Sequence, residues 1–282
     1  MKIGFIGLGL IGGSLAISIK NAFPGSYIVA MNRSEDSLKL ALEKGAIDKG
    51  VRTVGDDFKD CDMIFLCTPV ETNISFLEQL KSLIGPDTIL TDVGSVKSGI
   101  HEAVDRILPD AVFIGGHPMA GKEKVRFENA SGELIKDAYY YLTPSKNACE
   151  EHIAKMKNIV EKIGAIPVIV EPSLHDLIVA AISHVPHMAA YTLVRLVKDS
   201  DTDEEYMRIS AAGGFKDITR VASSDPTMWQ QICLENRENI VTLMKKYIEE
   251  LEIITDLIEK SDSKALFDYF DISKKYRDSI IG

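Results

Sequence analysis

The sequence has few cysteines, no excess of basic charge and no apolar run that approaches the ~20 residues of a membrane span. Its four cysteines lack C-x-x-C spacing, so we expect reduced thiols in a cytoplasmic protein, with neither a disulfide framework nor a zinc site. Nothing resembles a cleavable leader. The formal net charge of −10 argues against nucleic acid or an anionic membrane as a partner, and an anionic substrate would need a local basic group.

The chain does contain enough apolar residues for a substantial core. Of its 282 residues, 45% are hydrophobic and 26% are charged, which is typical of a folded protein. This length suits one large domain or two ordinary ones.

A glycine-rich stretch near the N-terminus predicts a dinucleotide site. Apolar and β-prone residues lead into Gly7, and Gly9 and Gly12 complete the G-x-G-x-x-G spacing before a helical apolar period begins. Gly7 permits a tight turn, Gly9 lets backbone approach a pyrophosphate, and Gly12 lets the helix close on the strand. The helix N-terminus, around Leu10 and Ile11, offers backbone N–H groups to the phosphates.

Up to about residue 171 strand and helix patterns alternate, which predicts an α/β fold with a Rossmann-type, doubly wound parallel sheet. Strands are expected over residues 27–31, 63–67, 88–91, 112–115, 139–142 and 166–170, and helices over 35–43, 73–83, 96–107 and 150–163. Ligand sites lie at the carboxyl ends of such strands. We therefore expect Thr68 and Pro69, residues 92–95 and residues 115–118 to face the cofactor crevice.

Beyond residue 171 the periodicity is helical, so we expect a dinucleotide-binding domain over 1–171 and an all-helical substrate and dimerisation domain over 172–282. Ser173 is predicted to cap a helix with Asp176 as its capping-box partner. Helical segments are expected over 173–199, 203–213 and 225–281, with a break near Ser261. An apolar stripe predicts a homodimer seam, with packing on the first domain as the alternative: Ile240, Leu243, Met244, Tyr247 and Leu251.

The end of the second predicted strand bears on the choice of nicotinamide cofactor. An NAD enzyme usually has an acidic residue there to bind the ribose 2′-hydroxyl, but this chain has Asn32, Arg33 and Ser34. Asn32 removes a charge that would repel a 2′-phosphate, Arg33 suits pairing with it, and Ser34 suits a hydrogen bond. This pattern favours NADP; if Arg33 only covers the adenine, NAD is equally acceptable.

Several polar residues are candidates for chemistry, although each also has an ordinary structural interpretation. His117 lies in a glycine-flanked loop after a strand, and Ser95 would be an N-cap if a helix began at the next residue. His184 and His187 flank a proline that is expected to kink their helix, so they are candidates for a crevice, for the core or for an i,i+3 metal pair. No third ligand has suitable spacing, so no metal is expected. Arg220 would otherwise form a surface ion pair.

Together these residues match one family. The chain resembles the prephenate/arogenate dehydrogenases of tyrosine biosynthesis over essentially its full length. Five motifs carry the resemblance, in order along the chain: Gly7-Leu-Gly-Leu-Ile-Gly-Gly13, Asp92-Val-Gly-Ser-Val-Lys97, Gly115-Gly-His-Pro-Met-Ala-Gly121, Ser183-His-Val-Pro-His187, and Lys216-Asp-Ile-Thr-Arg220 with Ser224-Asp-Pro226. Asn32 departs from the family pattern, since many relatives have an acid there.

The resemblance implies oxidative decarboxylation of prephenate to 4-hydroxyphenylpyruvate, with hydride transfer to NAD or NADP. By this analogy His117 draws the proton from the substrate 4-hydroxyl, and Ser95 orients both groups beside the nicotinamide. Arg220 holds a carboxylate, and His187 contacts the pyruvyl side chain with Ser183 beside it. The substrate would bind between the two domains of a homodimer.

Three alternatives stay open. An arogenate dehydrogenase would place an acidic residue near the substrate amine, and Glu123 suits that role; Lys122 and Lys124 flank it and favour prephenate instead. A β-hydroxyacid dehydrogenase would use a helical lysine, which Lys216 loosely resembles. A non-catalytic NADP(H) sensor would need only the glycine loop, and would leave His117 without a purpose.

Overall fold

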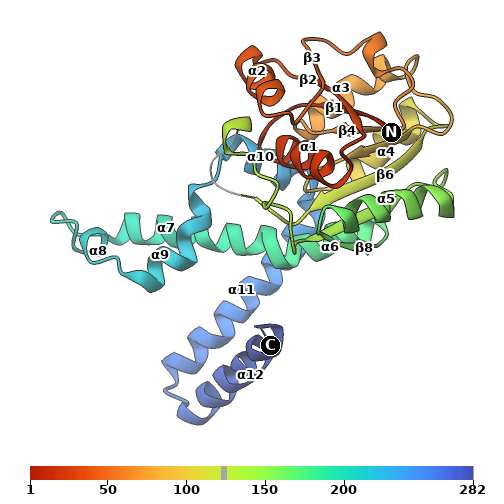
Figure 1. Cartoon of the computed structure of the whole chain (residues 1–282). Helices are drawn as coiled ribbons and strands as arrows, with labels where there is room; N and C mark the ends of the chain where they lie inside the picture. Colours follow the sequence, from red (N-terminus) through yellow and green to blue (C-terminus); the bar gives the residue numbers. More distant parts are fainter. Residues whose placement is uncertain (122–125, 282) are drawn as a thin grey trace. The chain divides into compact units, whose positions relative to one another are not determined.

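The computed structural model describes residues 1–121 and 126–281. The chain separates into two compact units, Met1–Asn236 and Arg237–Gly282 (Figure 1). The first unit contains the sheet and the predicted site residues. The predicted domain boundary at residue 171 lies inside it and stays a prediction.

The first unit is built on an eight-stranded sheet with the strand order β3-β2-β1-β4-β5-β6-β7-β8. The strands from β1 to β6 run parallel, which confirms the predicted doubly wound arrangement. β7 pairs antiparallel with β6, and β8 runs parallel to β7, so the all-parallel expectation was wrong at this edge. Their bounds are β1 (Lys2–Ile6), β2 (Tyr27–Met31), β3 (Lys49–Val51), β4 (Met63–Leu66), β5 (Ile89–Asp92), β6 (Val112–Pro118), β7 (Tyr139–Pro144) and β8 (Ile166–Ile169).

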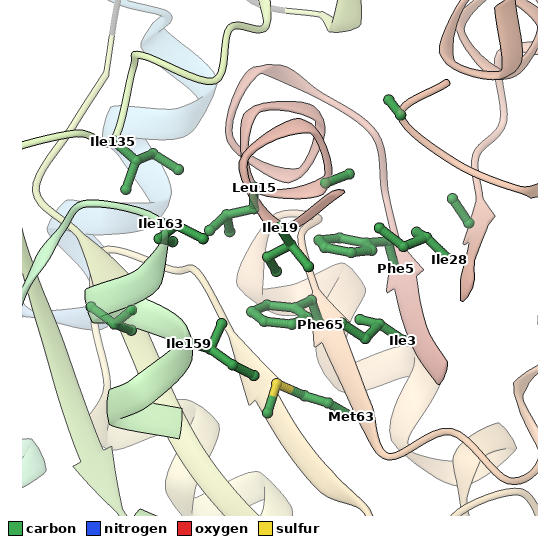
Figure 2. Packing of buried hydrophobic residues seen from close by; sticks show 14 of the residues in the cluster. Ile3, Phe5, Leu15, Ile19, Ile28, Met63, Phe65, Ile135, Ile159 and Ile163 are labelled. Carbon is green, nitrogen blue, oxygen red and sulfur yellow. The ribbon is translucent and has the colours of Figure 1, made fainter. Parts of the chain in front are cut away.

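Helices cover both faces of this sheet because its central strands are apolar on both sides. α1 (Leu10–Ala22), α2 (Glu35–Glu43) and α5 (Glu150–Lys162) bury their apolar residues on one face, and α3 (Val70–Leu80) and α4 (Ser98–Ile107) on the other. Figure 2 shows the first face, where Phe5 of β1 stacks on Phe65 of β4 with ring centroids 4.8 Å apart. This core fixes the carboxyl ends of β1 and β4, where the strand order reverses and a crevice opens.

Two predicted helix starts were wrong for one physical reason. α4 begins at Ser98 rather than directly after Ser95. α6 (Pro172–Val179) has Glu171, not Ser173, at its N-cap position, without a side-chain capping hydrogen bond and with Pro172 in its first turn. The Asp176 side chain instead accepts hydrogen bonds of 2.8 Å from the backbone N–H groups of Lys97 and Ser98. A carboxylate distant in sequence therefore supplies the N-terminal cap that α4 lacks locally.

The helical part of the first unit begins with one continuous run. α6 leads through a π-helical turn, η3 (Ala180–His184), into α7 (Val185–Ser200), so the irregularity comes just before Pro186. The expectation that no segment approaches a membrane span was wrong by length and composition alone, since the helical run over residues 172–200 is long and apolar enough to cross a membrane. His175 and Asp176 are buried in this run and bonded within the folded unit, so we assign the run to the fold. The remaining elements are η1 (Asp56–Phe58), η2 (Phe127–Asn129), α8 (Tyr206–Ile209), α9 (Gly213–Thr219), η4 (Arg220–Ser223) and α10 (Pro226–Glu235).

The second unit consists of α11 (Arg237–Glu259) and α12 (Ser263–Ile281). The predicted break near Ser261 is confirmed, since Ser261 has a positive φ of 55° between the two helices. Large apolar side chains remain exposed on both helices, including Leu251 at 45% and Phe267 at 69%. An exposed apolar surface of this kind is typical of an interaction face.

Candidate functional site

The loop between β1 and α1 has the geometry that a pyrophosphate requires. Gly7 has φ +102°, a conformation that favours glycine, and a Cβ on Gly12 would collide with the Gly7 carbonyl and lie 2.8 Å from the Cβ of Cys67. Gly9 is the N-cap of α1 without a side-chain cap, and a Cβ there would meet nothing within 4 Å. Open space in front of backbone N–H groups at a helix N-terminus fits a bound phosphate.

The three residues after β2 have different structural roles. Asn32 accepts a 3.3 Å hydrogen bond from the Leu8 backbone N–H through its side-chain oxygen, so it helps to hold the glycine loop. Ser34 caps α2, since its hydroxyl accepts a 3.2 Å hydrogen bond from the Ser37 N–H. Arg33 lies exposed between them. A positively charged side chain is therefore exposed next to the glycine loop.

Three adjoining cavities run from the glycine loop to the helical region, and they share lining residues such as Met228. The cavity next to the loop, of about 430 Å³, includes Gly9, Leu10, Ile11, Ser95 and His117 in its lining. A second, of about 550 Å³, lies along Thr68, Pro69 and residues 93–95. A third, of about 310 Å³, is lined by His117, Pro118, Ser183, His187, Arg220 and Trp229, among others.

Of the predicted strand-end residues, Thr68, Pro69, residues 93–95, His117 and Pro118 line this cleft. The expectation was wrong for Asp92, which is buried in an ion pair with Lys97, and for Gly115 and Gly116, which are buried within β6. The third cavity brings together His117 from the sheet and Arg220 from the helical region, which are far apart in sequence.

His117 is the buried residue at the centre of the site. Its Nδ1 lies 2.9 Å from Nε2 of His175, and Nδ1 of His175 lies 2.8 Å from Oδ1 of Asp176. Because the Asp176 carboxylate only accepts hydrogen bonds, His175 must donate from Nδ1, and its Nε2 is then an acceptor. His117 must therefore donate from Nδ1, which leaves its Nε2 with a lone pair. The chain Asp176–His175–His117 selects the tautomer in which His117 has a basic Nε2.

The protonation states agree with this assignment. Burial, with further contributions from His175 and Lys97, holds the pKa of His117 well below its usual value, so the imidazole is neutral near pH 7. Burial opposes ionisation of Asp176, but hydrogen bonds from His175, Ser98 and Lys97 outweigh it and lower the pKa of Asp176. A fixed carboxylate thus stands behind a neutral base.

A buried ion pair fixes the strand that presents His117. Lys97 is fully buried, pairs with the Asp92 carboxylate and donates a 2.9 Å hydrogen bond from Nζ to the Gly116 carbonyl. Asp92 in turn accepts a 3.1 Å hydrogen bond from the Gly116 N–H. Both groups of the Gly116 backbone are held by charged side chains, so the next residue along the chain, His117, is rigidly placed.

The third cavity has the groups that an anionic substrate requires. Arg220 opens the short helix η4 and is exposed toward solvent. His187 donates from Nδ1 to the Ser183 carbonyl at 2.9 Å and stacks on Trp229 with ring centroids 3.7 Å apart. The pKa of His187 is lowered by burial and by the Arg220 charge. One guanidinium and one oriented imidazole therefore border the same cavity.

The remaining predicted residues have other positions. His184 borders the cavity beside the glycine loop, but it is buried, receives a hydrogen bond from the Asn236 amide at 3.2 Å and packs edge-on against Trp229, so it belongs to the core beneath that cavity. Lys216 is exposed on α9, away from the described cavity linings. Glu123 lies outside the described residues. Within the described ranges no cluster of three or more His, Cys, Asp and Glu side chains is arranged to hold a metal.

Comparisons with known proteins agree with this arrangement. The family model for the prephenate dehydrogenase nucleotide-binding domain matches residues 15–169, and the model for the prephenate dehydrogenase dimerization domain matches residues 171–272. A prephenate dehydrogenase of Bacillus subtilis is 37% identical over 97% of this chain and 74% of its own length.

Two solved structures are similar over nearly the whole chain. Prephenate dehydrogenase from A. aeolicus, in complex with hydroxyphenyl propionate and NAD+, matches with a TM-score of 0.93 and 32% identity, covering 99% of this chain and 98% of its own. Synechocystis arogenate dehydrogenase matches with a TM-score of 0.87 and 30% identity, covering 99% of both chains.

Proposed function

Because the chain belongs to the prephenate dehydrogenase family, we infer that it converts prephenate to 4-hydroxyphenylpyruvate and CO2 with a nicotinamide cofactor. The cleft that joins the glycine loop to His117 and Arg220 carries this inference. Incubation with prephenate and NAD+ or NADP+ should raise the absorbance near 340 nm as 4-hydroxyphenylpyruvate appears. Turnover of arogenate but not of prephenate would instead identify an arogenate dehydrogenase. Activity on 3-hydroxy acids would identify a β-hydroxyacid dehydrogenase. Cofactor binding without any turnover would identify a sensor.

The site residues have distinct roles in this proposal. The bound nicotinamide supplies a hydride acceptor for C4 of the substrate. The lone pair on Nε2 of His117 accepts the proton of the 4-hydroxyl as the hydride leaves. The ring carboxylate then departs as CO2, its electron pair aromatises the ring, and the resulting phenolate oxygen takes the proton back from His117. Ser95 orients the hydroxyl, and Arg220 holds a substrate carboxylate. His187, with Ser183 beside it, contacts the pyruvyl side chain.

The chain Asp176–His175–His117 stabilises the proton once it has moved. A buried imidazolium at His117 is unfavourable by itself. Its Nδ1–H already donates to His175, and the Asp176 carboxylate supplies the opposite charge two hydrogen bonds away. We propose His175 and Asp176 as positioning residues, since they act through His117.

Asp176→Asn is expected to lower kcat about tenfold, less than the loss of His117 itself. An asparagine amide can donate to His175, which reverses the hydrogen-bond direction and places a proton on Nε2 of His117. If that tautomer is favoured by about 1.4 kcal/mol, the fraction of enzyme with a free lone pair on Nε2 of His117 falls about tenfold. The pH profile of kcat separates this role from a structural one, because losing the carboxylate moves the acidic limb to lower pH. An unchanged profile and kcat would leave Asp176 only as the cap of α4.

We propose NADP+ as the better cofactor, with Arg33 as the residue that binds the 2′-phosphate. Arg33→Ala should lower kcat/KM for NADP+ about tenfold and leave NAD+ nearly unaffected, because an exposed guanidinium pairs with the phosphate but has no partner on a 2′-hydroxyl. Steady-state assays with both nucleotides test this. Equal losses for both would mean that Arg33 covers the adenine, which removes the basis for NADP preference.

We also propose that the protein is a cytoplasmic homodimer assembled through its helical part. The dimerization-domain model matches residues 171–272, and apolar side chains of α11 and α12 are exposed in the single chain. Of the predicted seam, Leu251 is 45% exposed and Leu243, Met244 and Tyr247 are half-buried, whereas Ile240 is buried in the single chain and is not available to a partner. Light scattering should give twice the 31.1 kDa chain mass, and a monomer at micromolar concentration would refute the seam.

A further inference from the structure

An acidic residue, Glu235, lies in the second cavity, and the proposed reaction gives it no role. This cavity of about 550 Å³ is bordered on one side by the ends of β4 and β5, with Thr68 and Ser95, and on the other by α10. Glu235 is the last residue of α10 and is half-buried. Gln231, one helical turn earlier, lines the same cavity.

The shape and chemistry of this cavity suit the nicotinamide end of the cofactor. Its lining includes the apolar residues Ile11, Val70, Val93 and Ile232, which can pack against a flat ring. It shares Ile11 and Ser95 with the cavity beside the glycine loop, so a cofactor whose pyrophosphate lies on that loop can extend into it. Its polar side chains are then available to the reactive ring and its carboxamide.

The charges around Glu235 come from several elements. Glu71 of α3, Asp92 of β5 and Asp176 of α6 are acidic neighbours, and Lys97 is the basic one. Asp225, the N-cap of α10, lines the same cavity. Lys97 already pairs with Asp92. The surroundings of Glu235 are therefore predominantly acidic, and a cation that enters the cavity is attracted to them.

We propose that Glu235 discriminates between the oxidation states of the cofactor, because its carboxylate attracts the positively charged nicotinamide ring of the oxidised form and not the neutral ring of the reduced form. This inference rests on the proposed function, since it needs a nicotinamide in the cleft. It gives the enzyme a means to bind the oxidised cofactor and release the reduced one.

The proposal has a definite pH dependence. Burial and the charge of Glu71 raise the pKa of Glu235 to about 7, so the free enzyme has a partly protonated Glu235 at neutral pH. A cationic ring favours the carboxylate and lowers that pKa, so NAD+ binding releases a proton. Affinity for NAD+ should then rise about three- to tenfold from pH 6 to pH 8, while affinity for NADH stays level.

The experiment measures dissociation constants of the protein for NAD+ and NADH, and for NADP+ and NADPH as a second pair, by calorimetry between pH 5.5 and 8.5. Glu235→Gln should weaken NAD+ binding at pH 8 about three- to tenfold, leave NADH binding unchanged and abolish the pH dependence. Glu71→Gln should keep the dependence but move its midpoint to lower pH, because a like charge is removed. Glu78→Gln, on an exposed position of the same helix α3, is the matched control and should change nothing.

The outcomes separate this proposal from the proposed function. Equal pH profiles for NAD+ and NADH in the unmodified protein would overturn the role of Glu235 and leave the enzyme assignment intact. Equal weakening of both nucleotides by Glu235→Gln would also overturn it, since that indicates a hydrogen bond to the carboxamide, which both forms share. If neither NAD+ nor NADP+ binds at any pH, the proposed function itself fails.

Discussion

Replacing His117 with asparagine is expected to lower kcat by about two to four decades, with little change in KM for prephenate. Asparagine keeps a polar side chain of similar size that can still donate to His175, so the cavity and the bound substrate should be preserved. It has no basic nitrogen to take the 4-hydroxyl proton. The loss therefore falls on the chemical step, and steady-state kinetics at saturating cofactor measures it.

The pH profile gives an independent test of the same base. The neutral form of His117 is the active one, and its pKa is lowered, so activity should persist as the pH falls through 6.5 and decline only at lower pH. His152→Asn is the matched control, since His152 caps α5 outside the cleft and should keep normal turnover. Near-normal kcat in His117→Asn would remove His117 from the mechanism.

Hydrophobic periodicity predicted the strands and helices of the first unit well, because the apolar side chains that make up the sequence pattern are the ones buried in its core. The strand 27–31 and the helix 35–43 have the predicted bounds. The three-residue β3 was missed, since it is too short to show alternation and contains Gly50. The reversed direction of β7 was also missed. A sequence period shows that a strand exists but not which way it pairs, and that depends on contacts between distant segments.

The same limit applies to the site. Motifs predicted His117, Ser95, His187 and Arg220, and the structure places all four along one cleft. His175 was not predicted as a site residue, and Asp176 was predicted only as a local capping residue. They act on groups 58 and 79 residues away, the His117 ring and the Lys97 backbone, and no short spacing reports such pairs. The one available signal was two adjacent ionisable residues, His-Asp, in an otherwise apolar helical run.

Arg220→Ala is expected to raise KM for prephenate about 10- to 100-fold, with a smaller effect on kcat. A charge-assisted guanidinium–carboxylate contact is worth about 1.5–3 kcal/mol, and each 1.4 kcal/mol is a factor of ten in affinity. Arg220 is exposed, so solvent screening places the expected value toward the lower part of this range. Since the chain has a net charge of −10, no general attraction for an anion replaces the lost contact.

A matched variant separates the shape of the guanidinium from its charge. Arg220→Lys keeps the positive charge but loses the planar fork, so it should recover only part of the affinity if the contact is bidentate. His187 is a second indicator, because the Arg220 charge holds its pKa down. In Arg220→Ala that pKa should rise, and titration of the His187 ring by NMR would report it without substrate. An unchanged KM together with an unchanged His187 titration would place Arg220 outside the substrate site, and the carboxylate contact would have to be assigned to another cation.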